Sequence, residues 1–147
     1  MSTYFDSSVL VAVYVTEASS GAARRALRAV PQAPFTALHE LEVRNAFELL
    51  IGRGSITRAE GLAIGAQLDE DLDAQRLLRT PLDLERVFEQ ARDLSRAHSA
   101  KALTRSLDLL HVAAALIIPC TRFVSADSRQ LAVARGAGLK GVEPRRT

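Results

Sequence analysis

The feature that most limits how this chain can fold is the alternation of very short apolar segments with longer segments of helical pattern. Parallel strands cannot be joined by a tight turn, so short strands that alternate with helices predict parallel βαβ units. We therefore predict an α/β fold, a three-layer α/β/α sandwich with a short, mostly parallel central sheet. The strands are expected at residues 3–6, 34–37, 76–80, 122–125 and 140–142.

Local signals set the expected helix boundaries. Thr57 and Glu60 have the spacing of a capping box, and Pro31 ends the helix before the second strand. Residues 8–14 fit either a helix or a continuation of the first strand, whereas residues 98–107 are polar and basic and predict a loop. The remaining helices are expected at residues 21–29, 38–53, 57–73, 84–97, 108–118 and 128–136.

Length and composition indicate one globular domain over residues 1–147, because 48% of the residues are hydrophobic and 24% are charged. The single cysteine, Cys120, lies in an apolar stretch and predicts a small core residue in a reducing compartment. We see no leader peptide and no apolar run near the ~20 residues of a membrane span, so we expect a cytoplasmic protein. A net charge of +2 is compatible with a nucleic-acid substrate but is no evidence for one.

Most of the 17 acidic residues have an ordinary structural explanation. Glu40 and Glu48 alternate with Arg44 at spacings of four and predict a solvated helix face, and Asp83 is placed to cap a helix. The run Asp69, Asp71 and Asp73 imitates the start of a calcium loop. It lacks the required glycine and closing glutamate, so we interpret these three acids as solvated.

Four acids lack such an explanation. Asp6 ends the first strand, Asp127 follows the fourth strand, and Asp108 opens the most apolar helix, while Glu42 lies on the core-facing side of its helix. The binding edge of a parallel sheet lies beyond the carboxyl ends of its strands, so these acids are expected to converge there. Alternatives stay open: Asp108 and Asp127 could be simple helix caps, Asp6 could start a turn, and Glu42 could pair with a basic side chain.

Converging carboxylates predict a metal site. Two such charges 4 Å apart repel by about 4 kcal/mol at an effective dielectric of 20, and a divalent cation removes this cost. Oxygen ligands select hard cations, which indicates Mg²⁺ or Mn²⁺. Such a cation can activate water and stabilise the charge that develops on a phosphodiester, so a phosphodiesterase is a chemically sensible expectation.

The same segments resemble the sequence motifs of PIN domains. YFDSSVLV is similar to the first motif of that family, with Asp6 as its metal-binding acid. TALHELEVRNA is similar to the second motif, which places Glu42, rather than Glu40, as the acid. Each motif alone is weak, and the specificity comes from finding all four in order.

RSLDLLHVAAAL resembles the third motif, with Asp108 as the acid, and FVSADSRQLAVARGAGL resembles the fourth, with Asp127 as the acid. All four motifs occur in order and span nearly the whole chain, and they are most similar to VapC-type toxins of VapBC toxin–antitoxin pairs. The resemblance implies an Mg²⁺- or Mn²⁺-dependent endoribonuclease that hydrolyses RNA with metal-activated water. It also implies a VapB-like antitoxin partner and a homodimer.

The resemblance also assigns supporting residues. The family usually has Thr two residues before the fourth acid, where this chain has Ser125, which keeps the hydroxyl group. Ser8 is expected to help orient Asp6 in a similar way. His111, one helical turn after Asp108, is interpreted as a packed core residue rather than a ligand, since hard cations prefer oxygen.

Three basic residues near the motif acids, Lys101, Arg105 and Arg129, are expected to contact RNA phosphates, although ordinary surface charge explains them equally well. Two other functions stay open. The first is a PIN-like RNA- or partner-binding module with little catalysis, which metal-independent binding without turnover would favour. The second is a structure-specific DNA nuclease, which the short chain disfavours.

Overall fold

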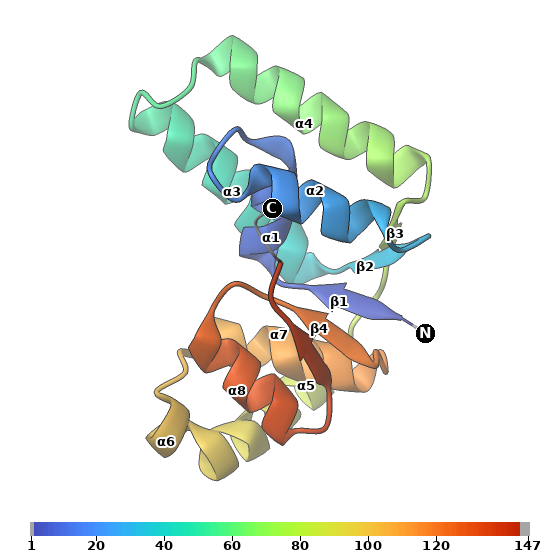
Figure 1. Cartoon of the computed structure of the whole chain (residues 1–147), viewed down its shortest axis with the longest axis vertical. Helices are drawn as coiled ribbons and strands as arrows, with labels where there is room; N and C mark the ends of the chain where they lie inside the picture. The colour runs from blue at the N-terminus through green and yellow to red at the C-terminus, as the bar shows by residue number, and fades with distance from the viewer. Residues whose placement is uncertain (1, 145–147) are drawn as a thin grey trace. The chain divides into compact units, whose positions relative to one another are not determined.

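The computed structural model describes residues 2–144, which form helices and short strands in alternation (Figure 1). Clustering of close residues divides the described chain into two compact units, one made of residues 2–6 and 81–144 and the other of residues 7–80. The single domain expected over residues 1–147 stays a prediction, and residues 1 and 145–147 lie outside the described part.

The first unit contains a three-stranded sheet in the order β1-β4-β5. Both strand pairs are parallel, with Phe5 opposite Val124 and Val124 opposite Val142. Its elements are β1 (Thr3–Phe5), α5 (Leu84–Leu94), a π-helical segment (Ser95–Ser99), α6 (Ala100–Ala102), α7 (Ser106–Ile117), β4 (Arg122–Val124), α8 (Ser128–Gly136) and β5 (Lys140–Val142).

The core of this unit is built from the strands and from α7. Tyr4 of β1 and Phe123 of β4 are fully buried and stack with their ring centroids 5.5 Å apart. All residues of α7 from 109 to 115 are buried, which explains why its sequence is apolar on every side. Cys120 is also buried, as its apolar surroundings predicted, and its burial raises the pKa of its thiol.

The second unit contains a two-stranded parallel sheet, β2-β3, and a long helical hairpin formed by α3 and α4 (Figure 1). Thr36 caps α3, and α3 ends before Gly54, whose φ of +74° is a conformation that glycine adopts without strain. Its elements are α1 (Ser7–Tyr14), α2 (Ser20–Arg28), β2 (Ala33–Phe35), α3 (Ala37–Gly52), α4 (Arg58–Asp73) and β3 (Leu77–Arg79).

The predicted α/β fold with short parallel strands is confirmed, since every strand pair among the described residues is parallel. The capping box of Thr57 and Glu60 is present at the start of α4, and Asp83 caps α5. Residues 8–14 are helical, which settles the alternative that the sequence left open.

One predicted loop is wrong. Residues 98–102, assigned to a loop over 98–107, continue the preceding helix as a π-helical segment and α6. The stretch has neither glycine nor proline, so its polarity alone does not interrupt the helix. The helical run ends only at Leu103, which adopts a left-handed conformation with φ +56°. Over the residues described, none of the helices combines the length and apolarity that crossing a bilayer requires.

Candidate active site

Asp6 follows β1 directly and lies at the carboxyl end of the first unit's sheet. Its backbone N–H extends the parallel ladder by donating to the carbonyl of Val124 over 2.9 Å. Its side chain is only 6% exposed, although a carboxylate in water would be fully hydrated. Burying a carboxylate costs free energy unless polar groups compensate it. The hydrogen-bond donors and charges around Asp6 therefore determine what this edge of the sheet can bind.

Asp108 lies in the first turn of α7, two residues inside the helix. The helix begins at Ser106 with Arg105 as its N-cap residue, so the interpretation of Asp108 as a helix cap is wrong. Its side chain is half-buried beside the end of the sheet. A carboxylate in a first turn gains some stabilisation from the helix dipole, which is the one ordinary benefit left for this position.

Asp127 is the N-cap of α8, as the capping interpretation predicted. Its Oδ1 accepts hydrogen bonds from the backbone N–H groups of Arg129, over 2.8 Å, and Gln130, over 3.4 Å. The cap uses only this oxygen, so capping and a role at the candidate site do not exclude each other.

The three carboxylates share one electrostatic environment. Burial raises the pKa of Asp108, and the negative charges of Asp6 and Asp127 raise it further, while Arg105 and His111 act in the opposite direction. A raised pKa means that the ionised form of Asp108 is less stable here than in water. Repulsion of this kind among carboxylates is what a bound cation relieves, and raised carboxyl pKa values are typical of functional sites.

Gln130 connects these acids, and it was not among the site residues predicted from the sequence. Its side-chain amide donates to Oδ1 of Asp6 over 3.1 Å and to the backbone carbonyl of Asp108 over 3.2 Å. Its Oε1 accepts from the hydroxyl of Ser125 over 2.6 Å. The hydroxyl of Ser125 in turn accepts from the backbone N–H of Asp127 over 3.0 Å, so the orienting part expected of this hydroxyl has a structural basis.

Glu42 belongs to the second unit, on α3, and its side chain is half-buried rather than fully buried. Its Oε1 accepts a hydrogen bond from the hydroxyl of Ser7 over 3.0 Å. Ser7 is the residue that follows Asp6 in the chain, and sequence reasoning missed it in favour of Ser8, which is exposed. The roles expected of Glu42 and Ser8 stay predictions.

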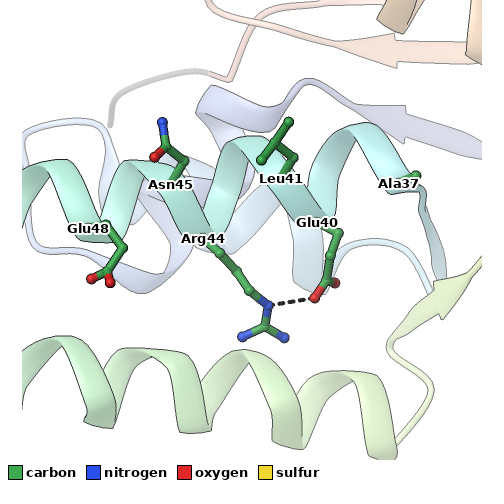
Figure 2. Close-up of a pocket in the computed structure, with 6 residues that line it drawn as sticks. All are labelled: Ala37, Glu40, Leu41, Arg44, Asn45 and Glu48. Carbon is green, nitrogen blue, oxygen red and sulfur yellow. Dashed lines mark hydrogen bonds and ion pairs between the residues drawn. The ribbon is translucent and has the colours of Figure 1, made fainter.

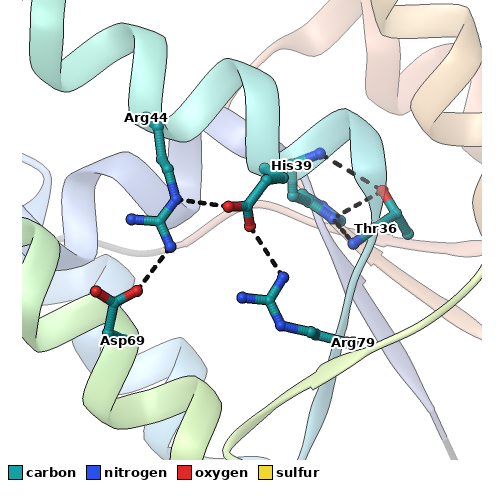
Figure 3. A network of polar contacts seen from close by, with 6 residues as sticks. Thr36, His39, Arg44, Asp69 and Arg79 are labelled. Carbon is teal, nitrogen blue, oxygen red and sulfur yellow. Dashed lines mark hydrogen bonds and ion pairs between the residues drawn. The ribbon is translucent and has the colours of Figure 1, made fainter.

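Glu40, which the sequence assigned to a solvated helix face, forms ion pairs with two arginines that Figure 3 labels, Arg44 and Arg79. It contacts Arg44 over 2.7 Å and Arg79 over 3.3 Å, and Arg44 also binds Asp69 over 2.7 Å. These ion pairs connect Glu40 to Arg79 of β3 and, through Arg44, to Asp69 of α4. Nearby, His39 completes the capping box of Thr36 by accepting from its backbone N–H over 2.9 Å.

A hollow lies along α3 and is lined by residues of this helix (Figure 2). Leu41 is 72% exposed there, which is unusual for a large apolar side chain. Three of the residues that line the hollow, Glu40, Arg44 and Glu48, take part in ion pairs. Its lining residues are Ala37, Glu40, Leu41, Arg44, Asn45 and Glu48.

His111 is buried and hydrogen-bonded, as its interpretation as a packed residue requires. Its Nδ1 lies 2.6 Å from the hydroxyl of Tyr4, and the side chain is 1% exposed. The three basic residues expected to contact RNA, Lys101, Arg105 and Arg129, are exposed. Their contact with RNA stays a prediction.

The donor chemistry at the carboxyl edge of the sheet suits a hard divalent cation, because the side chains of Asp6, Asp108 and Asp127 offer carboxylate oxygens. As the side chains lie, no group of three or more His, Cys, Asp or Glu residues within 2–144 is close enough to hold a metal ion. A cation at this edge would therefore have to draw these carboxylates closer together.

Comparison with known proteins supports the resemblance that the sequence suggested. The family model described as PIN domain matches residues 3–136. No match was found among curated proteins.

Solved structures of the same fold include toxins. VapC20 of Mycobacterium tuberculosis, described as a toxin that cleaves the sarcin–ricin loop, is 18% identical with a TM-score of 0.69, covering 97% of this chain and 100% of its own. FitAcB of Neisseria gonorrhoeae is 15% identical with a TM-score of 0.70 and 97% coverage of both chains. A toxin–antitoxin complex from Klebsiella pneumoniae is 15% identical with a TM-score of 0.64, covering 99% of this chain and 100% of that one.

Proposed function

The chain belongs to the PIN-domain family, and we propose that it is a divalent-metal-dependent endoribonuclease that acts as the toxin of a toxin–antitoxin pair. The observation that carries this proposal is the group of Asp6, Asp108 and Asp127 at the carboxyl end of β1 and β4, where burial and the two neighbouring charges raise the pKa of Asp108. The family match runs through both compact units, which supports the expected single domain.

Asp6, Asp108 and Asp127 are the residues that would hold Mg²⁺ or Mn²⁺, with Glu42 as a fourth acid. When bound, the cation would lower the pKa of water and stabilise negative charge on a phosphodiester. Asp6 is fixed by the amide of Gln130, and Asp127 is fixed by its cap and by Ser125. These contacts limit side-chain motion before substrate arrives, which is the part of catalysis that a protein supplies through rigid positioning.

Exposed basic side chains would contact the substrate at this site. Arg105 is near enough to lower the pKa of Asp108, so a phosphate beside that acid would be within its field. Lys101 and Arg129 extend the positive charge along the same unit. Contacts of this kind position the RNA backbone without reading its sequence.

The partners we propose are RNA, a VapB-like antitoxin and a second copy of the chain. The structural likeness to the toxin–antitoxin complex of Klebsiella pneumoniae supports an antitoxin as partner. The homodimer rests on the family resemblance, and sedimentation of the purified chain tests it directly. A monomer at all concentrations would remove the second copy from the proposal.

The test is cleavage of total RNA by the full chain with Mn²⁺ or Mg²⁺ and then with EDTA. We expect discrete cleavage that needs metal and that Asp6→Ala and Asp108→Asn abolish. Asp93→Asn is the matched control, since it removes the charge of an exposed carboxylate, 69% accessible, that lies outside the site. Metal-independent RNA binding without turnover, by folded and antitoxin-free protein, would favour the binding-module alternative.

Glu42 has its own matched pair on the same helix. We expect Glu42→Gln to reduce cleavage strongly and Glu40→Gln to leave it unchanged, because Glu40 is engaged by Arg44 and Arg79. Equal effects of both substitutions would remove Glu42 from the proposed set of acids. Melting temperatures of both variants show whether either effect comes from unfolding.

A further inference from the structure

Gln130 is a fully buried polar side chain on the inner face of α8. Its exposed fraction is 0%, and the neighbouring inner positions of the helix, Leu131, Val133 and Ala134, are apolar. A buried amide costs free energy unless its hydrogen-bonding groups are satisfied. The hydrogen-bond partners of Gln130 therefore indicate its role.

Every hydrogen-bonding group of the amide is occupied. The two hydrogens of Nε2 go to Oδ1 of Asp6 and to the carbonyl of Asp108, and Oε1 accepts from the hydroxyl of Ser125. A carboxylate and a carbonyl can only accept, so the amide cannot be turned around without placing Oε1 against two acceptors. The orientation of Gln130 is thus fixed by its partners.

Ser125 carries the connection to the third acid. Its hydroxyl hydrogen is committed to Gln130, and its oxygen accepts from the backbone N–H of Asp127. A hydrogen-bonded path therefore runs from Asp127 through Ser125 and Gln130 to Asp6 and to the backbone of Asp108, buried at its centre and part-buried at Asp127 and Asp108. Hydrogen-bond networks of this kind specify one arrangement of side chains, because each donor in the network has a fixed acceptor.

The neutrality of the amide matters as much as its position. Like charges on Asp6 and Asp108 repel, so these acids need a donor if they are to stay near each other. A lysine or arginine would bind Asp6 more strongly but would cancel charge that a cation needs. The glutamine amide holds the carboxylate in place and leaves its negative charge intact.

We propose that Gln130 is a positioning residue that holds Asp6 in register with the backbone of Asp108, so that a divalent cation has only to draw the carboxylates together over the remaining distance. This inference rests on the proposed metal-dependent function. Gln130 binds Asp6, the backbone of Asp108 and Ser125, and it acts on the cation and on RNA only through the acids. Removal of such supporting contacts in metal sites typically costs about 10- to 100-fold in metal affinity or activity.

The test is the affinity of the purified full chain for Mn²⁺, followed by electron paramagnetic resonance of free Mn²⁺, for the wild type and for Gln130→Met. Methionine keeps the length and volume but cannot donate to Asp6. Val133→Ala is the control, because it loosens the same helix at a fully buried position through lost packing alone. All three proteins are measured below the onset of melting, and RNA cleavage is recorded beside the titration.

We expect Gln130→Met to bind Mn²⁺ about 10- to 100-fold more weakly than the wild type, while Val133→Ala keeps the wild-type affinity. Equal Mn²⁺ affinity for Gln130→Met and wild type, or an equal loss in Val133→Ala, would overturn the positioning role while leaving the nuclease standing. A wild type that neither binds Mn²⁺ nor cleaves RNA would overturn the proposed function itself, and this inference with it.

Ser125→Ala is the second variant, needed if Gln130→Met does not fold. It removes the donor that fixes Oε1 of Gln130 and should weaken Mn²⁺ binding in the same direction but by less. If both variants fold, their effects on Mn²⁺ affinity should not add, because they break one path. If Gln130→Met does not fold, wild-type Mn²⁺ affinity in Ser125→Ala would contradict the proposal. If both variants fold, losses of Mn²⁺ affinity that add fully when the two substitutions are combined would contradict it.

Discussion

Replacing Asp108 by asparagine should make the metal-free protein more stable at neutral pH, even though it removes a proposed ligand. Asp108 is half-buried and feels the charges of Asp6 and Asp127. For scale, unit charges 4 Å apart repel by about 1 kcal/mol in bulk water and about 4 kcal/mol at an effective dielectric of 20, and the repulsion falls as the separation grows. Solvent screening of a half-exposed group favours the lower figure for each pair.

One effect opposes this gain. A carboxylate in the first turn of a helix is stabilised by about 0.3–1 kcal/mol through the helix dipole, and Asp108→Asn loses that benefit. Burial and two like charges together outweigh it, which is why the pKa of Asp108 is raised and not lowered. We therefore expect a net gain of about 1 kcal/mol, or about 3 °C in melting temperature for a chain of this size.

The pH dependence gives the sign of the effect an independent check. Because the pKa of Asp108 is raised in the folded state, the folded chain binds more protons than the unfolded chain. Its contribution to the free energy of unfolding therefore falls as the pH rises from the ordinary carboxyl pKa, about 3.9, through the folded value. Asparagine does not titrate, so the advantage of Asp108→Asn should be largest at neutral pH and should disappear below that ordinary pKa.

Urea unfolding in EDTA at pH 7 and at pH 3.5 or below measures both quantities. A variant less stable than the wild type at pH 7 would refute the reasoning, because the like charges would then not dominate at this position. An equal gain at both pH values would also refute it, because the effect would not come from ionisation.

Other substitutions test the fold and the substrate surface. Tyr14→Phe removes a 2.6 Å hydrogen bond to the Asp71 carboxylate and should cost about 1.5–3 kcal/mol in chemical denaturation; a loss below a few tenths would show that the bond is not formed in solution. Thr57→Ala breaks the capping box of α4 and should cost about 1 kcal/mol, which Thr57→Ser should largely restore; equal melting of all three proteins would contradict the capping. Arg105→Ala and Lys101→Ala should raise the KM for RNA and reduce its salt dependence with little change in kcat; a loss in kcat alone would place these residues elsewhere in the reaction.

The positions of three candidate acids were predictable because they follow from local pattern. Asp6 comes directly after β1, Asp127 lies three residues after the end of β4, and Asp108 lies in the first turn of an apolar helix. The carboxyl ends of parallel strands lie at the same edge of a sheet. Residues just beyond these ends therefore lie near one another, however far apart they are in the sequence. The distinction between Glu40 and Glu42 came from the family motif, and the ion pairs of Glu40 agree with it.

Gln130 was not predicted, since little in the local sequence distinguishes it from an ordinary helix residue. Its bond to Asp6 joins positions 124 residues apart, and such a contact leaves no periodicity in the sequence. The one available signal was a polar residue at an inner position of an otherwise apolar helix face. The helical segment at residues 98–102 was missed for a different reason: polar residues were taken as a loop although no residue there breaks a helix.

The central claim is that the carboxyl end of the β1-β4-β5 sheet is a divalent-cation site. Crystals of the full chain grown with Mn²⁺, with diffraction measured at the manganese absorption edge, test it most directly. We predict an anomalous peak about 2 Å from carboxylate oxygens of Asp6, Asp108 and Asp127, lost in crystals of Asp6→Ala. Well-ordered crystals at saturating Mn²⁺ with no peak at these acids, or with a peak only elsewhere, would contradict the claim.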